Sequence, residues 1–207
     1  VFITNECMRQ PPQFAEQLWQ RIRQMNETHG VKNVKEIQID CDWSKQTQEV
    51  YFQFLRQLHQ LLAKAGLKLS VTIRLHQLGM QAPPVDKGTL MLYNTGDFRQ
   101  LSNQKPILDP EVVRQYIGGL RSYSLPLNAA YPLFRVRALF RSGKFVGIIH
   151  TKDEYPVLPT DSVAVRETTF ADLQSVQQLI NKHRPDVHNE IILYDINNRN
   201  LTKYSSN

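Results

Sequence analysis

Two acidic residues stand at alternate positions near the end of one predicted strand. Asp40 and Asp42 lie in the run from Ile39 to Trp43. Side chains two residues apart on a strand point to the same side, about 6–7 Å apart. Two carboxylates at that separation repel each other, which favours a proton on one of them and suits general acid–base chemistry. The structural alternative is that Asp42 caps the following helix and Asp40 forms an ion pair with Arg74.

Other residues that could take part in catalysis or binding lie at the ends of the neighbouring predicted strands. Arg74 and His76 close the strand after the two acids. Arg74 would neutralise one of these acids and favour its ionised form, and His76 is a candidate ligand contact or proton carrier. Glu6 follows the first predicted strand and Asp195 ends the last one, so either is a candidate second carboxylate. Their structural alternatives are a helix start for Glu6 and a turn for Asp195.

Aromatic residues also gather at predicted strand ends. They are Trp43, Tyr93, Tyr131 and Tyr194. The flat C–H faces of sugars pack on aromatic rings, so such a set suits a carbohydrate site, although a core role is the alternative for each ring taken singly.

Composition and spacing argue against several other classes of protein. The 207 residues are 41% hydrophobic and 21% charged, and no apolar run approaches the length of a membrane span. The net charge is +6, but no basic run of five occurs, so a nucleic-acid partner is not expected. The six histidines lack metal-ligand spacing, and there is no Gly-rich phosphate loop, so neither a metal nor a cofactor is expected. The chain has two cysteines, Cys7 and Cys41, which are too few for a disulfide scaffold. Cys41 is expected to be a small buried hydrophobic residue.

Strand-like and helix-like segments alternate along the whole chain. The predicted strands are residues 1–4, 35–42, 67–75, 89–93, 127–131 and 191–195. Predicted helices open at Pro11-Pro12 and run over about residues 47–65, 109–123 and 169–183, with Gly30 and Gly66 as stops for the first two. Residues 134–151 interrupt the pattern as a hairpin that turns at Ser142-Gly143.

This order predicts an α/β protein with parallel strands covered by helices. The strands at 35–42 and 67–75 each carry one polar face, which fits the lumen of a TIM-type (β/α) barrel. A doubly wound open sheet is the alternative, but its central strands are usually apolar on both faces. A full barrel takes about 250 residues, so the prediction is one domain over residues 1–207. It would be a barrel of about six β/α units, incomplete at its N-terminus.

Residues 34–96 resemble the central segment of the family-18 glycoside hydrolases, the chitinase-like barrels. The resemblance rests on the order and spacing of four motifs: Asp40-x-Asp42, Phe54-Leu55-x-x-Leu58, Leu69-Ser70-Val71-Thr72-Ile73 and Met91-Leu92-Tyr93-Asn94. A group of uncharacterised bacterial barrel proteins is more similar than the chitinases proper. The resemblance implies an extracytoplasmic location and leaves the oligomeric state undefined.

The same resemblance implies roles for individual residues. Asp42 would orient the acetamido group of a sugar, Asp40 would tune its charge, and Tyr93 would hydrogen-bond the same group. Asn94 stands where the family has an acid, and Ser44 stands where it has the catalytic acid. The expected function is a divergent glycosidase, or a lapsed one that only binds oligosaccharide. The alternative is a scaffold whose hairpin contacts a protein partner.

Overall fold

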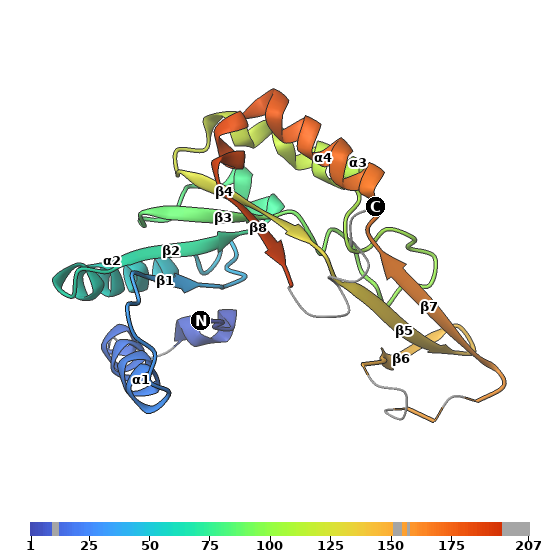
Figure 1. The fold of residues 1–207 in the computed structure, drawn as a ribbon, viewed down its shortest axis with the longest axis horizontal. Coiled ribbons are helices and arrows are strands. Elements are labelled where there is room, and N and C mark those ends of the chain that lie inside the picture. Colours follow the sequence, from blue (N-terminus) through green and yellow to red (C-terminus); the bar gives the residue numbers. More distant parts are fainter. Residues whose placement is uncertain (10–12, 151–154, 157, 196–207) are drawn as a thin grey trace. The chain divides into compact units, whose positions relative to one another are not determined.

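The computed structural model describes residues 1–9, 13–150, 155–156 and 158–195 (Figure 1). The chain divides into two compact units, residues 1–90 with 122–128 and residues 91–121 with 129–207. One sheet has the strand order β1-β2-β3-β4-β8, and a second sheet has the order β6-β5-β7.

The first unit is built on a parallel register. β1 (Glu36–Ile39) pairs with β2 (Lys68–Ile73), which pairs with β3 (Lys87–Met91). Ile37 and Ile39 are buried while Gln38 and Asp40 are only half-buried, so the predicted alternation is confirmed. Gln38 Nε2 donates to Thr89 Oγ1 at 2.9 Å, so the polar face forms hydrogen bonds of its own.

Two amphipathic helices belong to the same unit: α1 (Phe14–Thr28) and α2 (Gln48–Lys64). α2 buries a stripe of its residues, namely Tyr51, Phe52, Phe54, Leu55, Leu58 and Leu62. Gly30 and Gly66 follow the two helices with φ of 62° and 71°, the left-handed conformation that glycine adopts most readily. Pro11 and Pro12, predicted to open the first helix, lie outside the described residues.

The first predicted strand is only a single parallel bridge, between Phe2 and Asp40. Ile3 N–H donates to Asp40 C=O at 2.9 Å, and a short 3₁₀ helix (Asn5–Arg9) follows. The other five predicted strands form the five-stranded sheet. The described residues therefore contain a parallel sheet with covering helices, but not six complete β/α units.

β4 (Leu127–Pro132) pairs in parallel with β8 (Ile191–Tyr194) through its residues 129–132, which belong to the second unit. Asp109 caps α3 (Pro110–Tyr116) by accepting a hydrogen bond from Glu111 N–H at 3.0 Å. Thr169 caps α4 (Phe170–His183) in the same way, through Asp172 N–H at 3.1 Å. A short 3₁₀ helix, Ile117–Ser122, follows α3, and another, Pro185–Asn189, follows α4.

The hairpin has a third strand that the sequence analysis missed. β5 (Arg135–Arg141) turns at Ser142-Gly143 into β6 (Lys144–Ile148), as predicted, and β7 (Asp161–Glu167) pairs along the other side of β5. One face of this antiparallel sheet buries its own small core. Val136, Ala138 and Phe140 lie there with Ile107, beside Phe98, Phe134 and Phe145.

The lengths and apolar character of the helices bear on a membrane-spanning segment. Within the part of the chain that the structure describes, none is long and apolar enough to span a bilayer.

Gly88 of β3 tests the packing of the first unit. A Cβ atom there would lie 2.8 Å from Leu127 Cδ2 and 2.9 Å from Leu125 Cδ2. We expect Gly88→Ala to lower the free energy of unfolding by about 1–3 kcal/mol in urea titrations, because the site is already filled. Gly118→Ala is the control, since nothing lies within 4 Å of a Cβ there. Equal effects of the two substitutions would contradict the packing described.

Candidate functional site

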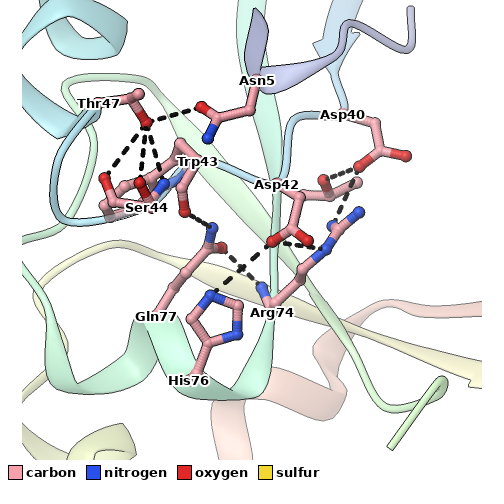
Figure 2. A network of polar contacts seen from close by, with 10 residues as sticks. Asn5, Asp40, Asp42, Trp43, Ser44, Thr47, Arg74, His76 and Gln77 are labelled. Atoms are coloured by element: carbon pink, nitrogen blue, oxygen red, sulfur yellow. Dashed lines mark hydrogen bonds and ion pairs between the residues drawn. The ribbon is translucent and has the colours of Figure 1, made fainter. Parts of the chain in front are cut away.

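Arg74 joins the two candidate acids of the first unit (Figure 2). Asp40 follows β1 and Arg74 follows β2, and the carboxyl ends of parallel strands meet at one edge of a sheet. Arg74 Nη1 lies 3.2 Å from Asp40 Oδ1, and Arg74 Nε lies 3.1 Å from Asp42 Oδ1. Thr72 Oγ1 also donates to Asp40 Oδ1, at 2.6 Å. The predicted contact of Arg74 with the acids is confirmed, and it includes both of them.

Gln77 fixes the turn that carries Arg74. Its Oε1 accepts from Arg74 N–H at 2.8 Å, and its Nε2 donates to the carbonyl oxygen of Trp43 at 3.0 Å. Gln77 is fully buried in a 3₁₀ helix (Leu75–Gly79). A single buried amide therefore ties the segment after β2 to the segment after β1, and this tie was not predicted.

We call Asp40, Asp42, Arg74 and His76 the acid cluster. His76 Nε2 lies 3.8 Å from Asp42 Oδ1. The side chain of Asp42 is 59% exposed and that of His76 is 48% exposed, against 31% for Asp40 and 23% for Arg74. Asp42 and His76 thus face solvent, while Asp40 and Arg74 form the less exposed part of the cluster beneath them. Ion pairs this exposed add little stability.

Ser44 has a structural environment rather than a catalytic one. Its backbone N–H donates to Thr47 Oγ1 at 3.0 Å, and its Oγ lies 3.4 Å from the same oxygen. Thr47 Oγ1 in turn donates to Asn5 Oδ1 at 2.7 Å, which links the start of α2 to the N-terminal segment (Figure 2). The position that the resemblance assigns to a proton donor therefore belongs to a turn.

Trp43 lies in the interior, not at the surface. Its ring is fully buried, stacked on Tyr51 at a centroid distance of 6.0 Å and edge-on to Phe52 at 5.3 Å. The ring therefore offers no open face to a sugar in this structure. Cys41 and Trp43 lie beyond the end of β1 but continue the buried odd-numbered alternation of Ile37, so the alternation itself signals the burial of Trp43.

The buried groups beneath the acid cluster stay uncharged. Burial raises the pKa of Cys41 to about 12, which agrees with its predicted role as a small hydrophobe. Burial also raises the pKa of Tyr51 well above its ordinary value. In the part of the chain that the structure describes, neither the Tyr51 hydroxyl nor the Trp43 indole N–H has a hydrogen-bond partner.

Glu6, one candidate second carboxylate, is exposed in the N-terminal 3₁₀ helix. It makes no ion pair with another described residue. Nor do the described residues include any group of three or more His, Cys, Asp or Glu side chains placed to hold a metal ion.

The second unit brings together Tyr93 and Tyr194. The two rings stack with centroids 5.2 Å apart and planes 6° apart, and Phe134 stands edge-on to each ring at 6.0 Å. We call Tyr93 and Tyr194 the tyrosine pair. Asn94 and Asp195 follow the pair directly in the chain; Asn94 is exposed and Asp195 half-buried. Phe134 was missed, although its place just after β4 matches that of Tyr194 at the end of β8.

Tyr131 is buried, unlike the tyrosine pair. Its hydroxyl lies 2.7 Å from His188 Nε2, and His188 Nδ1 lies 2.7 Å from Asn181 Oδ1. The two rings also stack, with centroids 5.9 Å apart. Burial lowers the pKa of His188 and raises that of Tyr131. Tyr131 therefore packs in the protein interior and does not form part of a surface on which a sugar could stack.

Several solved structures share this fold. The spore cortex-lytic enzyme SleL of Bacillus cereus matches with a TM-score of 0.62 and 16% identity, over 95% of this chain and 55% of its own. A putative sporulation-specific glycosylase, YdhD of Bacillus subtilis, matches with a TM-score of 0.58 and 16% identity, over 89% of this chain and 77% of its own. A mutant GH18 chitinase from Cycas revoluta, in complex with (GlcNAc)4, has a TM-score of 0.57 and 11% identity, over 94% of this chain and 75% of its own.

The chain has the fold of the chitinase-like glycoside hydrolases, which is an α/β-barrel fold. It spans about half the length of the SleL chain that it matches. No protein-family model and no curated protein matches the sequence.

His188 makes stability in the second unit depend on pH. Because its pKa is lowered on folding, the unfolded chain binds more protons below about pH 6.5, and stability falls as the pH drops below that value. We expect the free energy of unfolding to fall less between pH 7 and pH 5 in His188→Gln than in the unsubstituted protein. His29→Gln, at an exposed position, is the control and should keep the original slope. Identical pH profiles for all three proteins would contradict this account.

Proposed function

We propose that this protein binds an N-acetylated oligosaccharide at the acid cluster and does not hydrolyse it. The observation that carries the proposal is the position of Arg74 between Asp40 and Asp42, with one carboxylate half-buried and the other open to solvent. The glycoside hydrolase fold of the similar structures supports the same class of ligand.

The chemistry of the acid cluster suits a neutral sugar. The Asp42 carboxylate accepts hydrogen bonds, and would take them from the hydroxyl groups or the acetamido N–H of a ligand. Arg74 offsets part of the negative charge, so the cluster suits a neutral ligand better than a divalent cation or a strongly charged ligand. Hydrogen bonds to a charged group contribute about 1.5–3 kcal/mol each, which is enough for selective though moderate affinity.

The absence of a proton donor at Ser44 argues for binding without hydrolysis. A serine hydroxyl does not protonate a glycosidic oxygen near neutral pH, whereas a carboxylic acid can. The hydroxyl is moreover engaged beside Thr47. Substrate-assisted cleavage needs both the orienting acid and the donor, and only the first has a counterpart here.

Within the second unit, the tyrosine pair would supply a separate contact for sugar. Tyr194 is 51% exposed, and the exposed Asn94 follows Tyr93 directly. An aromatic surface beside an amide can pack on the C–H face of a sugar and hydrogen-bond its polar edge.

Asp42 tests the binding proposal directly. We expect Asp42→Asn to weaken the affinity for (GlcNAc)4 about tenfold or more, measured by native mass spectrometry, because a charged acceptor is lost. Glu49→Gln is the matched control, since Glu49 is an exposed acid paired with Arg56 on the surface of α2. If Asp42→Ala retains full affinity, the acid cluster is not the site. If the folded protein binds no sugar, the scaffold alternative replaces the proposal.

The same samples test hydrolysis. We expect (GlcNAc)4 to be recovered intact after long incubation, because Ser44 supplies no proton. Shortened products would contradict this expectation and make the protein a glycosidase with a replacement acid. Glu6→Gln and Asp195→Asn would then identify the donor, and if both variants still cleave, neither residue is it.

A further inference from the structure

The loop between β3 and α3 begins immediately after Tyr93 and Asn94. It closes on itself at its base, where Gly96 N–H donates to the carbonyl oxygen of Pro106 at 2.9 Å and Asp109 N–H donates to Thr95 Oγ1 at 2.8 Å. Residues 97–105 between these contacts contain no helix or strand. A loop of this length needs contacts from elsewhere to hold one conformation.

Arg166 of β7 supplies two such contacts. Its Nη1 donates to Gln104 Oε1 at 2.9 Å, and its Nη2 donates to the carbonyl oxygen of Leu101 at 2.7 Å. Both acceptors belong to the loop. Arg166 is only 7% exposed, so these hydrogen bonds are shielded from competing water.

An ion pair fastens the loop a second time. Lys105 Nζ lies 2.7 Å from Asp172 Oδ1, and Thr169 Oγ1 donates to Asp172 Oδ2 at 2.6 Å. Burial opposes the charge on Asp172, but the hydrogen bonds from Lys105 and Thr169 outweigh it and lower its pKa. Phe98 adds an apolar contact, edge-on to Phe145 of the three-stranded sheet at 6.2 Å.

The environment of Arg166 is costly for stability alone. Its two acceptors are neutral, and among the described residues its Nε has no hydrogen-bond partner and it forms no ion pair with a carboxylate. A buried charge without a counter-charge is destabilising, and a well-packed apolar side chain would usually replace it at lower cost. Arg166 instead fixes the conformation of the loop, because two donors on one rigid guanidinium plane hold the loop at two points.

We propose that Arg166 is a positioning residue, which acts with the Lys105–Asp172 pair to hold the loop at residues 95–108 and so to orient Tyr93 and Asn94 for a sugar. This inference rests on the proposed function. It gives the three-stranded sheet a role in the sugar-binding surface of its own unit, in place of the protein contact of the scaffold alternative.

Hydrogen–deuterium exchange of the full chain tests the first part of the proposal. We expect Arg166→Met to raise amide exchange in residues 95–108 by about tenfold or more, because two shielded hydrogen bonds are lost. Arg141→Met is the matched control: Arg141 also lies on β5–β7, but its contacts are Asp161 and the carbonyl oxygen of Pro156. Unchanged exchange in the loop, or the same change in both variants, would overturn the proposal.

Binding tests the second part. We expect the affinity for (GlcNAc)4 to fall about tenfold in Arg166→Met, mainly through faster dissociation, and to recover in part in Arg166→Lys. If the unsubstituted protein binds the sugar and Arg166→Met binds it equally well, this inference fails while the proposed function stands. If the unsubstituted protein binds no sugar, the proposed function fails, and the role of Arg166 toward sugar fails with it.

Discussion

The parallel register of β1 and β2 is the constraint on which the candidate site depends. Ile39 lies opposite Val71, so the residues that follow the two strands emerge at the same edge. Asp40 and Asp42 would repel each other there, and Arg74 from the next strand offsets that repulsion by contacting both. A shift of one residue in either strand would turn the polar face of that strand over and separate the arginine from its acids. The buried amide of Gln77 holds the ends of these strands together.

Two arginines in this chain illustrate two uses of one side chain. Arg74 is partly exposed, contacts carboxylates and shapes a cluster that remains open to a ligand. Arg166 is buried, contacts neutral acceptors and fixes a loop. The guanidinium plane serves both purposes because its donors are rigidly arranged. The two arginines differ in their cost to folding stability, which is small for Arg74 and substantial for Arg166.

Local patterns in the sequence predicted most of the elements. The alternation at 35–42 and 67–75, the glycines after α1 and α2 and the cap at Thr169 depend on neighbouring residues, and each has its physical cause in the sequence. β7 was missed because its pairing partner is β5, more than twenty residues away, and because Val163 and Val165 are exposed on a sheet that is covered on one face only.

The candidate site was predictable in part for the same reason. The contact of Arg74 with the acids follows from strand order and alternation. Phe134 and the ties made by Gln77 and Arg166 depend on where loops return, which a periodic pattern does not encode. Trp43 is a different case, since its alternation with Cys41 already indicated the interior. The predicted surface role of Trp43 was based on its aromatic side chain, whereas its position in the alternation indicated burial.

A crystal structure of the protein with (GlcNAc)4 tests the central claim most directly. The account predicts an intact sugar with a polar group within hydrogen-bond distance of Asp42, and with Arg74 still in contact with both acids. An oligosaccharide bound away from the acid cluster, or one cleaved in the crystal, would contradict it.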